Sequence, residues 1–251
     1  MKKTIQQCNI FLLLTVYFVN SALAQSNFIN SSKKDMPTIS VEDTLKKQFA
    51  DKKIPWPPVE LYVRSFKFDR QLEVWVKSDT KENFKLFKTY KVCMQSGTLG
   101  PKRMEGDYQM PEGFYYINEF NPNSNFHLAL GLNYPNAADK ILSDSLHPGS
   151  EIYIHGKCLS TGCIAIDNKP IEEVYLLATL AKEAGQEFIP VHVFPVKFSV
   201  KKSFEYLALI SKENQLLQKF IISLKNVFDY FEEKKQLPLI FVNKAGNYII
   251  N

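Results

Sequence analysis

Two residues near the middle of the chain, His155 and Cys163, have the types and the spacing of a nucleophile and its base. A cysteine attacks as the thiolate, and an unperturbed thiol, with a pKa of about 8.5, is only slightly ionised at neutral pH. A histidine held beside it can take the thiol proton and leave an imidazolium–thiolate pair. The sequence therefore predicts nucleophilic chemistry, with Cys163 as the nucleophile and His155 as the base.

Small and polar residues around this pair predict a tight loop that supports it. Gly156 follows the histidine, and its carbonyl could accept from Nδ1–H and leave Nε2 facing the thiol. Gly162 precedes the cysteine and permits a close approach of the chain. The N–H groups from Thr161 to Cys163 could form an oxyanion hole, and Ser160 could hydrogen-bond across the loop.

Two other interpretations of this cluster stay open at the level of sequence. A histidine at a strand end and small buried cysteines could be ordinary packing. His155, Cys158 and Cys163 also have a loosely zinc-like spacing, because a catalytic zinc needs only three protein ligands and a water. That spacing is not a usual one and no pair of carboxylates flanks it, so we expect neither a metal nor another cofactor.

Residues 1–24 have the features of a cleaved signal peptide. Two lysines at the start are followed by the apolar run Ile10–Val19 and by the small-residue cleavage site Ser21–Ala24. The apolar run is shorter than the roughly 20 residues that span a bilayer, although an uncleaved anchor is the alternative. We therefore expect a periplasmic or cell-envelope protein with no stable membrane insertion after the signal is removed.

Three cysteines follow that segment, and an odd number leaves at least one without an intramolecular partner. One arrangement pairs Cys93 with Cys158 and leaves Cys163 free. A second pairs Cys158 with Cys163 and would block the nucleophile, and a third leaves three thiols. The sequence does not choose among them.

Composition sets only broad limits on function. The formal net charge of +5 falls to +3 without the two lysines of the signal. So mild a charge, with no basic run interleaved with aromatic residues, does not indicate nucleic acid binding. The apolar fraction of 45% is normal for a packed core.

The elements that would position the pair are mostly strands. Apolar and polar residues alternate from Val59 onward, and two such runs separated by a short turn predict a β-hairpin. A turn-rich segment at 97–113 separates these strands from later ones, of which one ends at His155. The expected strands are 61–68, 72–76, 84–93, 114–117, 126–132, 151–155 and 188–198.

Helices are expected around this body. Asp167 or Asn168 can cap a helix that ends near Gly185, and a long helical pattern covers Ser203–Phe231. A short helix is expected near 40–50, and closing strands at 237–242 and 248–250. The expected organisation is a linker with a short helix at 25–56, a catalytic domain at 57–198 and a helical extension at 199–251.

His155-Gly156 followed by Ser160-x-Gly162-Cys163 resembles the active-site motif of the YkuD-type L,D-transpeptidase family. Within it, the chain resembles the murein L,D-transpeptidases that carry a short His-Gly-x-Cys-x-Ser-x-Gly-Cys motif. The resemblance covers roughly residues 45–198. The further matching segments are Pro57–Lys67, Ser96–Lys102, Glu105–Asp107, Pro111–Gly113 and Tyr134–Asn136.

This resemblance implies a mostly β fold with helices, of the α+β class: an L,D-transpeptidase-like β-sandwich or barrel with the helical C-terminal extension. It implies that Cys163 attacks a peptidoglycan stem peptide after the L-centre of meso-diaminopimelate, with D-alanine leaving and a thioester forming. His155 carries over as the base, Gly156 as its backbone orienter, and Ser160 and Gly162 as supports of the loop.

The resemblance leaves the acceptor open. The stretch between the histidine and the cysteine is shorter than in most members, and Thr161 replaces a second histidine. Members of the short-motif subgroup include hydrolases that cut the link between peptidoglycan and an outer-membrane lipoprotein. A carboxypeptidase or amidase of that kind is therefore the alternative, and a non-catalytic wall-binding module is an alternative of another class.

Other polar residues are weaker candidates. Lys102 and Arg103, in the turn-rich segment, could bind a substrate carboxylate or could form a solvated loop face. We expect His127 to be a strand residue with a hydrogen-bond partner, and the aromatic residues at 114–116 to belong to the core or the cleft wall.

Overall fold

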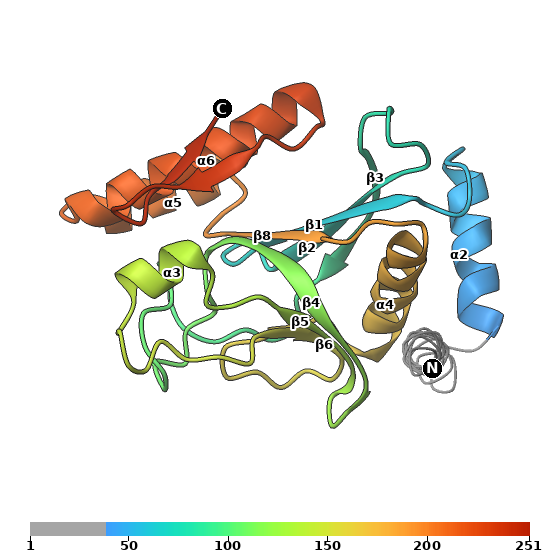
Figure 1. Cartoon of the computed structure of the whole chain (residues 1–251), viewed down its shortest axis with the longest axis horizontal. Coiled ribbons are helices and arrows are strands. Elements are labelled where there is room, and N and C mark those ends of the chain that lie inside the picture. The colour runs from blue at the N-terminus through green and yellow to red at the C-terminus, as the bar shows by residue number, and fades with distance from the viewer. Residues whose placement is uncertain (1–38) are drawn as a thin grey trace, which may run out of the picture. The chain divides into compact units, whose positions relative to one another are not determined.

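An eight-stranded mixed sheet is the centre of the computed structural model, which describes residues 39–251 (Figure 1). The expected signal peptide and most of the expected linker lie outside the described residues. The strands lie side by side in the order β3 (Lys85–Lys91), β2 (Gln71–Lys77), β1 (Glu60–Phe66), β8 (Pro190–Phe194), β4 (Gly113–Ser124), β5 (His127–Leu132), β6 (Tyr153–His155) and β7 (Ile164–Ala165). The expected α+β class is confirmed.

The predicted hairpin is β1 and β2. Their register runs from Glu60 opposite Lys77 to Phe66 opposite Gln71. After the first residue of each, every residue of both strands is buried, so the sheet is covered on both faces here. The alternation in the sequence therefore does not mark a solvent-facing side, and charged residues of these strands lie in the interior.

β4 connects the two halves of the sheet. Its first residues pair with β8 and its later residues with β5, and the register shifts between Ile117 and Glu119. β5 then pairs with β6, and β6 pairs in parallel with β7. This order puts the short strands that flank the expected catalytic loop at one edge of the sheet.

Helix α4 (Asn168–Glu183) follows β7 almost directly. The Asp167 side chain accepts a hydrogen bond from the backbone N–H of Asn168, and Gly185 just beyond the helix has a φ of +103°. Both predicted boundaries are confirmed. The helix packs on β1, β5 and β6 and against helix α2 (Ile39–Asp51), as Figure 1 shows.

The C-terminal segment forms two helices, α5 (Lys201–Ser211) and α6 (Gln215–Lys234), and a small sheet of β9 (Ile240–Val242) and β10 (Tyr248–Ile250). The prediction of one long helix over 203–231 is wrong. Asn214 adopts an extended conformation, and its side-chain oxygen accepts from the N–H of Leu217. It thereby caps a new helix and ends the first.

The C-terminal segment completes the core. Phe228 of α6 packs against Phe66 of β1 and Phe194 of β8 in one buried apolar cluster. All described residues fall in one compact unit, so the domain boundary at 198 stays a prediction. Within residues 39–251, no helix combines the length and apolar character needed to cross a membrane.

A buried charge cluster, formed by Arg64, Glu73, Lys197 and Glu232, joins the sheet to α6. Arg64 is fully buried, and its Nε and Nη2 donate to Glu73 Oε2 at 3.0 and 2.6 Å. Its Nη1 lies 2.7 Å from Glu232 Oε1 as an ion pair without hydrogen-bond alignment. Lys197 Nζ donates to the other Glu73 oxygen at 2.7 Å.

Candidate active site

Parallel pairing of β6 and β7 brings His155 and Cys163 to the same pocket. Ile154 pairs with Ile164 and His155 with Ala165, so the chain leaves β6 at the histidine and returns to its side just after the cysteine. Both side chains line one pocket of about 370 Å³. The two residues predicted from spacing alone are therefore brought together.

The imidazole of His155 is held in one orientation. Its side chain is buried, its Nδ1 lies 2.5 Å from the carbonyl oxygen of Gly156, and its ring centroid is 4.7 Å from that of Phe126. Because a carbonyl can only accept, Nδ1 carries the proton in the neutral ring and Nε2 is the basic atom. This is the contact that the sequence predicted for the Gly156 carbonyl.

Gly156 is needed for space as well. A Cβ at this position would lie 2.7 Å from the carbonyl oxygen of Phe126 and 2.8 Å from Oδ1 of Asn168. The second of these accepts from the N–H of Lys157, so it cannot move away freely. Any side chain here would push the turn away from the histidine.

Burial shifts both the cysteine and the histidine toward their neutral forms. Burial raises the pKa of the Cys163 thiol and the charge of Glu151 raises it further, against the N–H of Tyr153, which lowers it. Burial lowers the pKa of His155, and the Gly156 carbonyl offsets only part of that. Both directions favour the uncharged groups, so in the free protein they disfavour the imidazolium–thiolate pair that proton transfer to the histidine would leave.

Hydrogen bonds of Ser160 shape the catalytic loop. Its hydroxyl donates to the Cys163 carbonyl at 2.7 Å and accepts from the N–H of Gly162 at 3.2 Å. Gly162 has a φ of +140°, which favours glycine. The Gly162 N–H thus already donates to Ser160. Of the three N–H groups expected to form an oxyanion hole, those of Thr161 and Cys163 remain as candidates. Thr161 lines the pocket.

A disulfide closes this loop onto the adjoining segment. Cys93 and Cys158 are bonded, with their Cα atoms 5.6 Å apart, and Cys163 is free. The N–H of Cys93 also donates to the carbonyl of Ala165 in β7. This is the first of the three arrangements left open by the sequence. It removes Cys158 as a zinc ligand, and among residues 39–251 no three suitable side chains gather to hold a metal ion.

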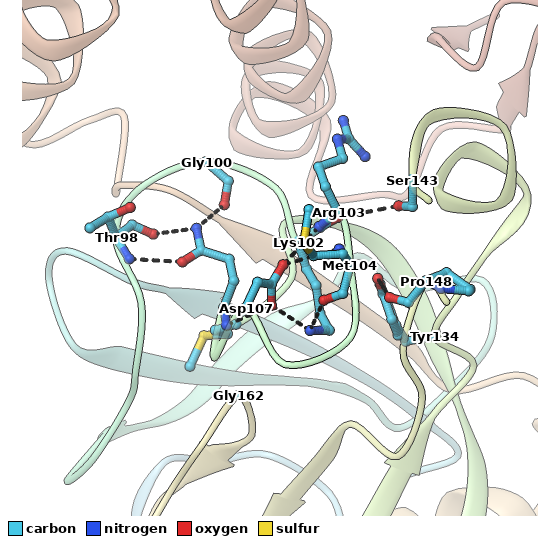
Figure 2. Close-up of polar contacts among 12 residues, drawn as sticks. Thr98, Gly100, Lys102, Arg103, Met104, Asp107, Tyr134, Ser143, Pro148 and Gly162 are labelled. Atoms are coloured by element: carbon cyan, nitrogen blue, oxygen red, sulfur yellow. Dashed lines mark hydrogen bonds and ion pairs between the residues drawn. The ribbon is translucent and has the colours of Figure 1, made fainter. Parts of the chain in front are cut away.

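Lys102 forms hydrogen bonds within the turn-rich segment and does not line the pocket that contains Cys163. Lys102 is only 6% exposed, and its Nζ donates to Asp107 and to the Met104 carbonyl. Figure 2 shows this pair inside the loop, with Arg103 pointing away from it and Gly162 nearby. Substrate binding by Lys102 stays a prediction that this geometry does not favour, and a solvated loop face is excluded by its burial.

Arg103 lies at a second pocket of about 510 Å³, outside the one that contains Cys163. Its guanidinium carbon is 5.8 Å from the Phe220 ring centroid, and its Nη1 is 3.9 Å from Asp139. The Arg103 side chain keeps about a third of its surface exposed. Residues of the turn-rich segment form one part of its wall and residues of α6 another, with Leu142 and Asn247 also lining it.

The sequence argument missed most of the wall of the catalytic pocket. The tip of the β4–β5 hairpin forms one side, and Glu151 lies on the rim. The expected strand at 114–117 left the polar residues after it unassigned, whereas β4 continues through them to Ser124. The residues of this tip that line the pocket are Asn121, Asn123, Ser124, Asn125 and Phe126.

His127 and the aromatic residues lie where they were expected. Nε2 of His127 is 2.6 Å from Glu172 of α4, so its expected hydrogen-bond partner is present. Tyr115 is buried, and its hydroxyl donates to Asp139. Neither residue lines the catalytic pocket.

Comparisons with known proteins relate the chain to one family. A family model described as the YkuD L,D-transpeptidase catalytic domain matches residues 69–193. The Escherichia coli K12 protein named "Putative L,D-transpeptidase YafK" is 33% identical over 193 residues, which cover 76% of this chain and 74% of that protein.

Two solved structures are more distant. The helical cell shape determining protein Pgp2 of Campylobacter jejuni has 20% identity and a TM-score of 0.42, over 79% of this chain and 81% of its own. L,D-transpeptidase 1 of Mycobacterium tuberculosis has 13% identity and a TM-score of 0.30, over 53% and 61%.

Proposed function

This chain belongs to the L,D-transpeptidase family, and we propose that it is a periplasmic cysteine acyl-transferase acting on peptidoglycan stem peptides. The observation that carries the proposal is the shared pocket of Cys163 and His155, with the imidazole fixed so that Nε2 is the basic atom. The periplasmic location rests on the signal-like sequence of residues 1–24.

Acylation begins from the neutral pair. As Sγ of Cys163 attacks the carbonyl of the L-centre of diaminopimelate, its proton passes to Nε2 of His155. The tetrahedral intermediate collapses when the bond to D-alanine breaks, and the imidazolium gives its proton to the leaving amine. The product is a thioester on Cys163 and free D-alanine.

Deacylation reverses the same proton path. An acceptor amine attacks the thioester while His155 takes its proton, and the thiol is restored when the imidazolium returns that proton to the sulfur. Water in place of the amine gives hydrolysis, which is the carboxypeptidase or amidase alternative, including cleavage of a lipoprotein link. Analysis of the products separates the two outcomes, since crosslinks or exchanged D-amino acids form only by transfer.

The backbone supports the developing oxyanion in this proposal. The N–H groups of Thr161 and Cys163 are the candidate donors, because Ser160 already engages that of Gly162. A donor of this kind contributes about 3 kcal/mol to acyl transfer. Ser160 acts indirectly, by holding the loop through the Cys163 carbonyl.

The proposal is tested with Cys163→Ala and His155→Ala in the mature chain. We expect both to lower turnover of tetrapeptide muropeptides by at least about a thousand-fold while thermal unfolding of Cys163→Ala stays near wild type. Intact-mass spectrometry should detect a thioester on the wild-type protein and none on Cys163→Ala. Wild-type turnover by Cys163→Ala, with no adduct on the native protein, would refute the proposal. Absence of turnover and of any adduct in the wild-type protein would favour a non-catalytic wall-binding module.

A further inference from the structure

Glu151 gives the catalytic pocket its only acidic side chain. Eleven residues line this pocket, and apart from the titratable histidine and thiol the others are uncharged. No lysine or arginine is among them. A ligand group bound here therefore meets one carboxylate and no fixed cation, which favours a positively charged group.

The Glu151 carboxylate has no partner of its own among the described residues. No hydrogen bond or ion pair engages it, whereas Glu119 nearby accepts from the Tyr153 hydroxyl at 2.9 Å. Its backbone has a φ of +57°, a left-handed conformation that is uncommon for a glutamate. Strain of this kind concentrates at functional sites.

The same residue is coupled to the nucleophile. Its backbone carbonyl accepts from Cys163 Sγ at 3.6 Å, and its negative charge raises the pKa of that thiol. In the free protein this carboxylate thus opposes formation of the thiolate. A cation placed beside Glu151 would cancel the opposing charge and ease the attack.

We infer that Glu151 binds the side-chain ammonium group of the residue whose carbonyl Cys163 attacks, so that the pocket selects amine-bearing stem peptides. This inference rests on the proposed function. Diaminopimelate carries such an ammonium at the end of its side chain. Binding of the donor peptide then removes the charge that disfavours the nucleophile, and activation depends on the correct substrate.

Paired peptides test this inference. Tetrapeptides with lysine at the third position keep the ammonium, and those with norleucine keep the four side-chain carbons but lack the ammonium. For Glu151→Gln we expect the second-order rate constant of acylation to fall about ten-fold with the lysine peptide. We expect it to stay equal or rise with the norleucine peptide, because the charge opposing the thiolate is gone.

The matched control is Glu183→Gln, which removes an exposed glutamate at the end of α4, outside both pockets. It should leave both peptides unaffected. In parallel, the rate of Cys163 labelling by iodoacetamide is measured as a function of pH. The midpoint of this pH dependence should move to lower pH in Glu151→Gln, because the charge opposing the thiolate is gone, and should not move in the control.

The outcomes separate the two proposals. If Glu151→Gln affects the lysine and norleucine peptides equally, the inference is overturned while the acyl-enzyme still supports the proposed function. If no peptide acylates the wild-type protein, the proposed function fails and the inference fails with it. Unchanged thermal unfolding of Glu151→Gln assigns the lost acylation to binding and not to folding.

Discussion

The charge cluster beneath α6 and the catalytic pocket differ in whether their charged groups have partners within the protein. In the cluster, Glu73 is 1% exposed and accepts from Arg64, Trp75 and Lys197. Burial raises its pKa, but the Arg64 charge and these hydrogen bonds lower it overall. In the catalytic pocket, the thiol and the imidazole shift toward their neutral forms and Glu151 stays unpaired.

The difference teaches that a shifted pKa does not by itself mark a functional group. The Glu73 shift is explained by partners inside the protein, so it is a statement about stability. The Cys163 shift comes mainly from burial, and the charge of Glu151, which no side chain of the described residues pairs with, adds to it. The two regions differ in whether the carboxylate has partners within the protein: Glu73 has them, and Glu151 has none among the described residues.

The largest effect on stability is expected from Glu73→Ala. Removal of this carboxylate leaves Arg64 and Lys197 without their shared partner, which costs about 3–5 kcal/mol of unfolding free energy. Urea unfolding measures this loss. Because the folded pKa of Glu73 is lowered, its contribution is present above the ordinary pKa of about 4.3 and is lost as pH falls through the folded value.

A control for this variant is Glu232→Ala, which removes the carboxylate at the edge of the same cluster. The Glu232 side chain is 33% exposed, so water can solvate what remains and the loss should be smaller. Equal losses from Glu73→Ala and Glu232→Ala would contradict the contrast between a buried and a peripheral partner.

A smaller loss is expected when the Cys93–Cys158 disulfide is removed by substituting both cysteines with serine. The bond spans 65 residues and should contribute about 2–4 kcal/mol. Since it anchors the loop between β6 and β7, acylation should fall as well. The measurement is urea unfolding with and without reductant. The reductant should lower the urea midpoint of the wild type and leave that of the double variant unchanged. An identical wild-type midpoint under both conditions would contradict the expected contribution of the bond to stability.

The smallest effect is expected at the second pocket, from Arg103→Gln. Its guanidinium is partly exposed, so we expect stability to change by at most about 0.5 kcal/mol. If Arg103 binds a substrate carboxylate, KM for anionic peptides should rise a few-fold while kcat is unchanged. Lys102→Gln is the comparison, because loss of the buried pair with Asp107 should lower the unfolding temperature without that KM change. A KM that Arg103→Gln leaves unchanged removes Arg103 from substrate binding.

Local patterns were enough to predict the core of the site and much of the fold. The hairpin follows from alternating residues, the start of α4 from Asp167, and the His155–Cys163 pair from chemistry and spacing. The disulfide could not be predicted without the fold, because backbone pairing of residues 93 and 94 with Ala165 of β7 brings Cys93 beside the loop. The break at Asn214 was missed because the apolar period continues through it.

The remaining errors concern burial. Lys102 was expected on a solvated loop face or in substrate binding because it lies in a turn-rich segment, and the sequence does not reveal its ion pair with Asp107. The sign of the Cys163 pKa shift also depends on burial and on Glu151, which spacing does not reveal. The hairpin tip that covers His155 comes from a different part of the sheet, so only the strand order places it there.

The pairing of Cys93 with Cys158 also protects the third sulfur. The three cysteines of the described residues permit three single bridges, and only the bond between Cys93 and Cys158 leaves Cys163 reduced. Once Cys158 is committed elsewhere, the thiol five positions away has no neighbour in the described chain with which to oxidise. In the oxidising periplasm that we propose for this protein, the Cys93–Cys158 bond would therefore prevent Cys163 from forming an intramolecular disulfide.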